Sequence, residues 1–254
     1  MRGIAFPLSV VLALLAVACE APANGPAAGG PSSSASIGSP PAASTTQEPS
    51  TSIEPAPPPA AIPEGVPATY HDDVPVRELP LDGLIPPGDE VTGVDRATTA
   101  GGEAVVISFA TPGPDPLAQA RGFVVWRRTL GANPPWRATY GVAHGKRSGV
   151  LAISAETTDL TGDGSDDALI REETGGSGAC ATYRVVDLEP GDPLWKRSVC
   201  DAEIQPSPDP IGLFEVARIF GPEDAHCCPS SIRERVLTWD GGRFEVVSEE
   251  LTPI

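Results

Sequence analysis

The chain has 254 residues, of which 34 are Asp or Glu and 17 are Lys or Arg, so its formal net charge is −17. Residues 61–254 carry −15 of this, because the first sixty residues hold only three glutamates and one arginine. Such a surface repels the phosphates of nucleic acids and of anionic lipid headgroups, which excludes both as partners of the folded part.

Residues 1–18 are predicted to be a signal peptide. Arg2 supplies the positive charge, and residues 4–17 form an apolar run too short to span a bilayer. The run ends in Leu15-Ala16-Val17-Ala18-Cys19, which resembles the lipobox of bacterial lipoproteins. This resemblance implies that Cys19 is diacylated and becomes the new N-terminus. The alternative is a plain secretory signal that is cleaved near Ala18.

A lipid on Cys19 would place the protein outside the cytoplasm. We therefore expect an exported protein of the cell envelope, anchored on the outer side of the cytoplasmic membrane or to the outer membrane. Residues 19–64 consist largely of Ala, Pro, Ser, Gly and Thr. This composition buries too little apolar surface to offset the entropy of ordering, so it predicts a disordered stalk between membrane and domain.

Residues 65–254 are predicted to form one all-β domain, either an antiparallel sandwich or a small barrel. Short runs rich in Val, Ile, Thr and aromatic residues alternate with clusters of Gly, Pro and Asp. The predicted strands are residues 104–110, 122–130, 136–142, 150–157, 168–173, 181–188, 195–200, 214–220, 235–239 and 244–247. One short helix is predicted over residues 116–121. The four tryptophans lie in or beside these strands and are expected in the core.

The clearest chemical signal is the acidic loop at residues 159–167, between two predicted strands. Oxygen-bearing side chains recur at every second position: Asp159, Thr161, Asp163, Ser165 and Asp167. Gly164 permits the sharp turn that wrapping a cation requires. Calcium takes six to eight oxygen ligands, which alternating side chains and a backbone carbonyl can supply. An EF-hand is excluded, because its twelfth position is Ile170 and the flanking segments are strands.

The loop resembles the calcium loops of FG-GAP and VCBS repeat proteins, with Thr161 in place of the second acid. The resemblance implies that Asp159, Thr161, Asp163 and Asp167 bind calcium through side chains and Ser165 through its carbonyl. Those proteins are propellers built from several copies, and this chain holds one copy. The alternative is a polar hairpin turn that binds no ion.

The last twenty residues provide a second resemblance. Residues 235–244, with the Asp240-Gly241 turn and the later Pro253, resemble the closing hairpin of actinobacterial lipoproteins of unassigned function. This similarity agrees with the lipoprotein interpretation and implies no activity.

Four cysteines remain after Cys19: Cys180, Cys200, Cys227 and Cys228. An exported protein is expected to pair them. Residues 180 and 200 lie symmetrically about the turn near residue 190, so a simple hairpin places these two opposite each other. Adjacent Cys227 and Cys228 would make a strained bridge. The two interleaved pairings remain open.

Signals for catalysis are weak. Ser177 lies in a run close to Gly-x-Ser-x-Gly, but residue 179 is Ala and a strand follows in place of a helix. The histidines at 71, 144 and 226 belong to no known motif, and the cluster at residues 224–228 lacks the spacing of a zinc site. We expect a monomeric binding or scaffold module with a structural calcium ion and an unidentified protein or glycan partner. A secreted hydrolase or metal-dependent enzyme is the alternative.

Overall fold

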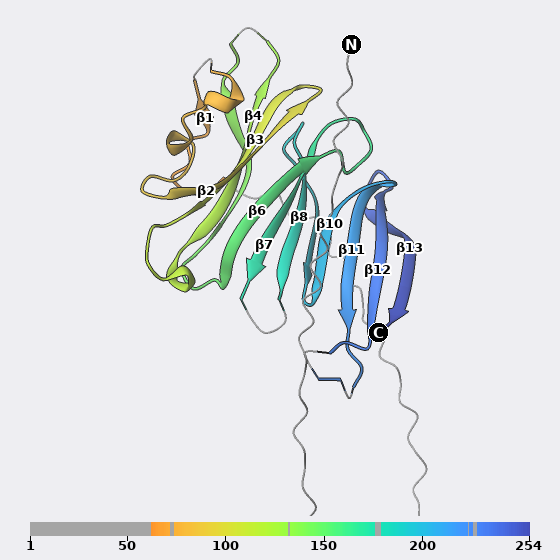
Figure 1. The fold of residues 1–254 in the computed structure, drawn as a ribbon. Helices are drawn as coiled ribbons and strands as arrows, with labels where there is room; N and C mark the ends of the chain where they lie inside the picture. Colours follow the sequence, from red (N-terminus) through yellow and green to blue (C-terminus); the bar gives the residue numbers. More distant parts are fainter. Residues whose placement is uncertain (1–61, 72–73, 132, 176–178, 223, 226–227) are drawn as a thin grey trace, which may run out of the picture. The chain divides into compact units, whose positions relative to one another are not determined.

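A computed structural model describes residues 62–71, 74–131, 133–175, 179–222, 224–225 and 228–254 (Figure 1). The chain divides into two units, residues 1–50 and 51–254, and every described residue belongs to the second. The predicted signal peptide, Cys19 and the predicted stalk up to residue 61 lie outside the described residues. In the part that is described, no helix is long and apolar enough to cross a membrane.

The described residues form thirteen strands and three short 3-10 helices. The strands are β1 (Thr69–Tyr70), β2 (Glu90–Thr99), β3 (Gly102–Ala110), β4 (Arg121–Thr129), β5 (Trp136–His144), β6 (Val150–Thr158), β7 (Asp167–Thr174), β8 (Ala181–Asp187), β9 (Pro193–Val199), β10 (Ala202–Pro208), β11 (Ile211–Ile219), β12 (Ser231–Trp239) and β13 (Phe244–Pro253). The helices are η1 (Val76–Glu78), η2 (Leu81–Gly83) and η3 (Pro116–Ala118).

The strands build three sheets, which follow one another in chain order in Figure 1. The first sheet has the order β1-β5-β4-β3-β2, the second β6-β7-β8-β9 and the third β10-β11-β12-β13. All paired strands are antiparallel. The predicted all-β antiparallel fold is therefore confirmed. In the described part of the chain the sheets stay open and none closes into a barrel.

The core of the described part of the chain consists of three apolar clusters, two of which lie between sheets. The first and second sheets share a cluster that includes Phe123 and Tyr140 on one side and Ile170 and Leu188 on the other. The second and third sheets share a cluster that includes Tyr183 and Leu213. The remaining cluster covers the other face of the first sheet with η1, η2 and nearby residues such as Leu84 and Ile85. Trp126, in this cluster, donates a hydrogen bond from Nε1 to Leu84 O at 3.0 Å.

The sequence pattern missed β1, β2 and β10. β10 contains Pro206 and Pro208, which usually argue against a strand. It is an edge strand, where a proline without an amide hydrogen is tolerated. β2 is largely polar and contains Gly93 at an irregularity in its pairing with β3. The predicted helix at 116–121 is shortened to the 3-10 turn η3, in which Asp115 accepts a hydrogen bond from Leu117 N at 3.0 Å.

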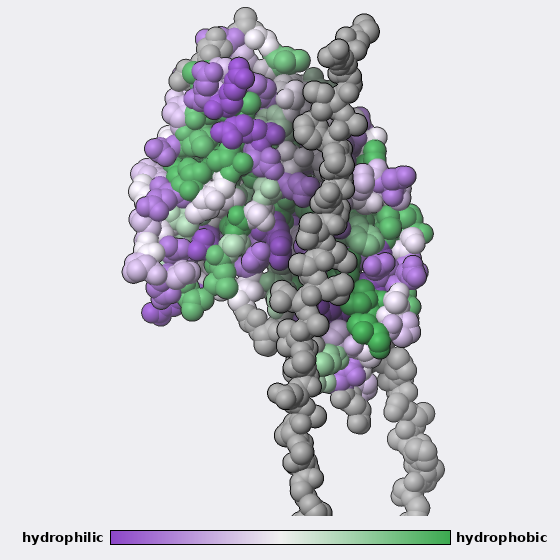
Figure 2. Space-filling view, viewed as in Figure 1, coloured by the Kyte–Doolittle hydropathy of each residue, from purple (hydrophilic) through white to green (hydrophobic). Residues whose placement is uncertain are grey.

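Exposed apolar side chains are spread over several places. They include Leu117 and Leu130 near the first sheet, and Val246, Val247 and Leu251 on the edge strand β13. On the face that Figure 2 shows, hydrophobic residues form separate groups among hydrophilic ones. This mixture is typical of a water-exposed surface.

Candidate cation-binding hairpin

The acidic loop joins β6 to β7 and is anchored in the core. Thr158 and Asp167 are Cα partners at its base. Leu160 is fully buried in the cluster between the second and third sheets. Gly162 and Gly164 have φ of 79° and 87°, a conformation that glycine adopts at little cost. The loop is therefore the tip of a β-hairpin, as predicted, and Gly164 has a backbone conformation that favours glycine.

Asp167 is the buried acid of the loop, with 1 % of its surface exposed. Its Oδ2 accepts hydrogen bonds from Leu160 N and Thr161 N, both at 3.0 Å, and from Thr161 Oγ1 at 3.1 Å. Burial raises the pKa of Asp167 to about 6, against the lowering effect of these donors. The negative charge of Asp187 contributes to this raised value. A charged Asp167 is therefore unfavourable in this place unless a cation compensates it.

The side chains of Asp159 and Asp163 accept hydrogen bonds from backbone amides of the loop. Asp159 accepts from Gly162 N at 2.6 Å and from Gly164 N at 3.0 Å. Asp163 Oδ1 accepts from Ser165 N at 2.8 Å. Each carboxylate oxygen has two lone pairs, so one hydrogen bond leaves capacity for a further ligand. Ser165 is buried, and its hydroxyl donates to Glu189 Oε2 at 3.1 Å.

The turn between β8 and β9 brings further acids to the same end of the second sheet, which the sequence analysis did not foresee. Asp187 is the Cα partner of Asp167. Its pKa is raised by burial and by the negative charges of Asp163, Glu189 and Asp192. Arg127 of the first sheet lies 4.0 Å from Glu189. The acidic spacing of this turn is visible in the sequence, but the strand register that places it beside the loop is not.

All of the candidate metal ligands in this region are oxygen atoms, which calcium prefers. The described residues include no group of three or more His, Cys, Asp or Glu side chains placed to hold a metal ion. The five predicted residues lie in one loop. The carboxylates of Asp159, Asp163 and Asp167 each accept hydrogen bonds from backbone amides of this loop. Calcium binding stays a prediction.

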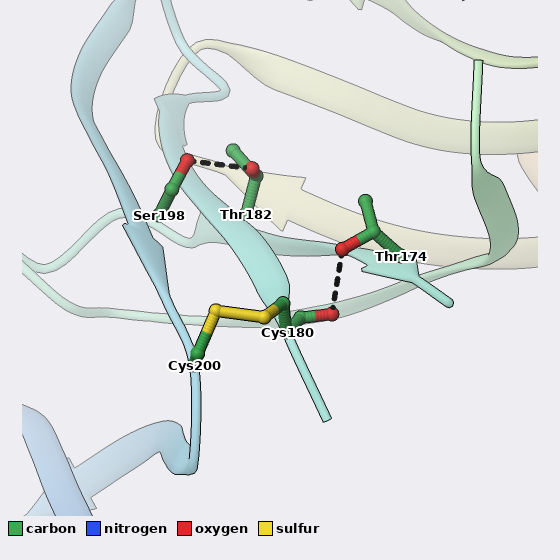
Figure 3. The surroundings of a disulfide bond; sticks show 5 residues. All are labelled: Thr174, Cys180, Thr182, Ser198 and Cys200. Carbon is green, nitrogen blue, oxygen red and sulfur yellow. Dashed lines mark hydrogen bonds between the residues drawn. A yellow bond between two sulfur atoms is a disulfide. The ribbon is translucent and has the colours of Figure 1, made fainter. Parts of the chain in front are cut away.

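The disulfide prediction is confirmed. Cys180 and Cys200 are bonded, with their Cα atoms 3.9 Å apart. Cys180 comes just before Ala181 and Cys200 just after Val199, and these two residues are Cα partners at the ends of β8 and β9. Figure 3 shows the bond between the two cysteines. Nearby, Thr174 Oγ1 donates to Cys180 O at 3.0 Å, and the Thr182 and Ser198 hydroxyls are 2.8 Å apart. Cys228 is exposed, and Cys227 lies outside the described residues.

The candidate catalytic groups are only partly described. Ser177 and His226 lie outside the described residues, and His71 is exposed. His144 takes part in a network between the first and second sheets, where its Nε2 lies 3.0 Å from Glu172 Oε1. Arg184 Nε donates to the same oxygen at 3.1 Å, and Arg184 Nη1 reaches Tyr140 OH at 3.5 Å. The sequence pattern did not single out this network.

A second ionic cluster links the second and third sheets. Glu215, 1 % exposed, lies 2.6 Å from Arg197 Nη1 and 3.5 Å from Arg233 Nη2. Arg235 Nη1 is 3.9 Å from Glu215, and Arg235 Nε also binds Glu249 at 2.5 Å. Several guanidinium groups thus compensate one buried carboxylate, which is the usual condition for burying a charge.

Comparison of the chain with protein-family models, with curated proteins and with solved structures found no match.

Proposed function

We propose that this protein is an exported, lipid-anchored binding module of the cell envelope, and that calcium stabilises its β6–β7 hairpin. The run before Cys19 and the composition of residues 19–64 support the anchor and the spacer. The single observation that supports the cation is the buried Asp167, whose pKa is raised to about 6 beside a second acid, Asp187. A divalent cation would offset this repulsion.

In this proposal Asp159, Thr161, Asp163 and Asp167 hold the ion through side chains and Ser165 through its carbonyl. The ion's contribution is structural: it neutralises the clustered carboxylates and fixes the hairpin. Extracellular calcium modules typically have Kd of about 10⁻⁴–10⁻³ M. At about 1 mM calcium, binding to the native state alone would then add about 0.4–1.4 kcal/mol of stability.

Thermal unfolding of the full chain tests this function. We expect millimolar calcium to raise the melting temperature by a few degrees over the same protein with chelator. Asp163→Ala should abolish the calcium-dependent shift. Asp166→Ala is the matched control, because it removes a carboxylate of the same loop outside the alternating set and should retain the shift. Identical melting curves with calcium and with chelator would show that the loop is an ordinary turn.

A further inference from the structure

A pocket of about 290 Å³ lies at the disulfide-bonded end of the second sheet. Its lining comes from β7, β10, β11 and β12, together with Ala179 and Asp201, which flank the bonded Cys180 and Cys200. Its size is close to the lower end of the range for small-molecule sites, about 300–1,000 Å³. None of the residues of the acidic loop at 159–167 lines it, so it is a separate site.

The pocket carries opposite charges in equal number. Arg171 and Arg218 supply the positive charges, and Asp201 and Glu203 the negative ones. Arg218 and Asp201 are close in the sheet, since Arg218 N donates to Asp201 O at 2.8 Å. Yet no ion pair joins Arg218 to Asp201 or Glu203 in the part of the chain that the structure describes. The charges of Arg218, Asp201 and Glu203 are therefore available to a ligand, whereas Arg171 also has a partner outside the pocket lining.

Arg171 is held at the pocket by its neighbour. Its Nη2 lies 3.3 Å from Glu173 Oε1. Its Nε is buried and has no hydrogen-bond partner among the described residues. A buried donor without a partner is costly, so the Arg171 guanidinium has unused hydrogen-bonding capacity at this pocket.

The remaining walls are apolar or small. Val216 and Ile232 provide aliphatic surface, and Ala179 and Ala202 leave room. Ala179 and Asp201 have φ of 42° and 55°, a region that residues other than glycine rarely adopt. Backbone strain of this kind gathers at ligand sites, where the surrounding structure over-determines it. The disulfide-bonded Cys180 and Cys200 lie next to these two residues in the chain.

We propose that this pocket binds a small zwitterion, an α-amino acid or dipeptide with an aliphatic side chain. The carboxylate would pair with Arg171 and Arg218, the ammonium group with Asp201 and Glu203, and the side chain would contact Val216 and Ile232. Cross-strand neighbours lie only about 5 Å apart, which suits a ligand whose two charges are adjacent. The balanced charge discriminates against simple anions and cations, because either would leave one pair of charges unsatisfied. This proposal names the ligand of the proposed binding module and so rests on that function.

Calorimetric titration of the purified full chain tests the proposal, with L-leucine and L-leucyl-L-leucine as probes. Isocaproate and isoamylamine are the controls, because they keep the aliphatic group and carry only one of the two charges. We expect saturable binding of at least one zwitterion, about tenfold or more tighter than either control. Absence of binding of both zwitterions up to about 10 mM would overturn the proposal.

Variants separate the site from a general effect on folding. Arg218→Gln should weaken zwitterion binding about tenfold, and Val216→Trp should block it by filling the pocket. Glu203→Gln should weaken the zwitterion but favour isocaproate, a reversal that a merely structural effect would not produce. Glu234→Gln is the matched control: Glu234 is the Cα partner of Val216 and lies outside the lining. Equal loss of binding in Arg218→Gln and Glu234→Gln would contradict the assignment.

The titration is run in calcium, after circular dichroism has shown that each variant is folded. A failure of leucine binding would leave the calcium-dependent melting and the acylation of Cys19 intact. A failure of those two measurements would not alter the titration. The two proposals can therefore fail separately.

Discussion

Asp167 and Glu172 are buried carboxylates on the same strand, β7, with opposite electrostatic outcomes. For Glu172, burial alone would raise the pKa, but hydrogen bonds from His144 and Arg184 and the positive charge of Arg184 outweigh it and lower the pKa. Asp167 receives hydrogen bonds only from neutral donors and faces Asp187, so its pKa is raised to about 6. Neutral hydrogen bonds do not replace a counter-charge, and the proposed calcium ion would supply one beside Asp167.

A pH dependence follows from Asp167. Its folded-state pKa of about 6 lies above the ordinary value of 3.8. Its contribution to stability is therefore full below the ordinary value and is lost as the pH rises through about 6. Asp167→Asn keeps an acceptor oxygen and removes the charge. Without calcium, we expect this variant to be about 1–3 kcal/mol more stable than the native protein at neutral pH.

Thermal melts in calcium-free buffer, at about pH 5 and about pH 7.5, measure this effect across the window set by the shifted pKa. The native protein should lose stability as the pH rises, and Asp167→Asn should lose less. Asp166→Asn serves as the control, because it removes a charge from the same loop. An equal pH dependence in all three proteins would show that Asp167 does not titrate in this range.

At the scale of elements, the β8–β9 hairpin is closed by a disulfide at its open end. The Cys180–Cys200 bond closes a loop of sequence separation 20. Its turn carries Asp187 and Glu189 to the acidic loop, while its other end carries Ala179 and Asp201 to the pocket. One covalent link thus restrains a hairpin that takes part in both candidate sites.

Loss of this bond should be costly. The double variant Cys180→Ser, Cys200→Ser is expected to lose about 3 kcal/mol of unfolding free energy, since the unfolded chain gains loop entropy. Denaturant titration measures the loss. Ser248→Ala, at an exposed position of β13, is the control and should match the native protein. If the double variant and the control unfold at the same denaturant concentration, the bridge contributes no stability.

At the scale of the described domain, three antiparallel sheets pack together through two shared apolar clusters. The strongly acidic charge of residues 61–254 would keep this domain away from an anionic membrane surface. The proposed lipid anchor and spacer are compatible with this repulsion, because they would attach the chain to a membrane without bringing the acidic domain onto its surface.

The anchor is tested by acyl-chain labelling of the expressed protein and by fractionation of membranes. Cys19→Ala should lose the label and leave the membrane fraction. Cys228→Ala is the matched control and should keep both properties. A Cys19→Ala protein that is still membrane-bound and equally labelled would exclude lipidation at this residue.

Local rules explain what the sequence alone determined. Alternating apolar residues and turn clusters predict most of the strands, because strand formation depends on a period of two and on the chemistry of the turns. The alternating oxygens at residues 159–167 define the hairpin loop for the same local reason. The Cys180–Cys200 pair also follows from one hairpin register, since both residues belong to neighbouring strands.

Only the tertiary structure decided which distant side chains meet. Sheet register places Asp167 beside Asp187 at the end of β8. Register and sheet stacking together form the Glu172–Arg184–His144 network and gather the arginines around Glu215. The pocket likewise places Arg171 and Ala179 beside lining residues from Asp201 to Ile232, which lie 30 or more positions after Arg171 in the chain. Such contacts depend on how apolar faces of separate sheets pack, and one sequence pattern is compatible with several packings. Local sequence patterns therefore predict the hairpins, whereas the packing of the sheets determines the charge environment of both candidate sites.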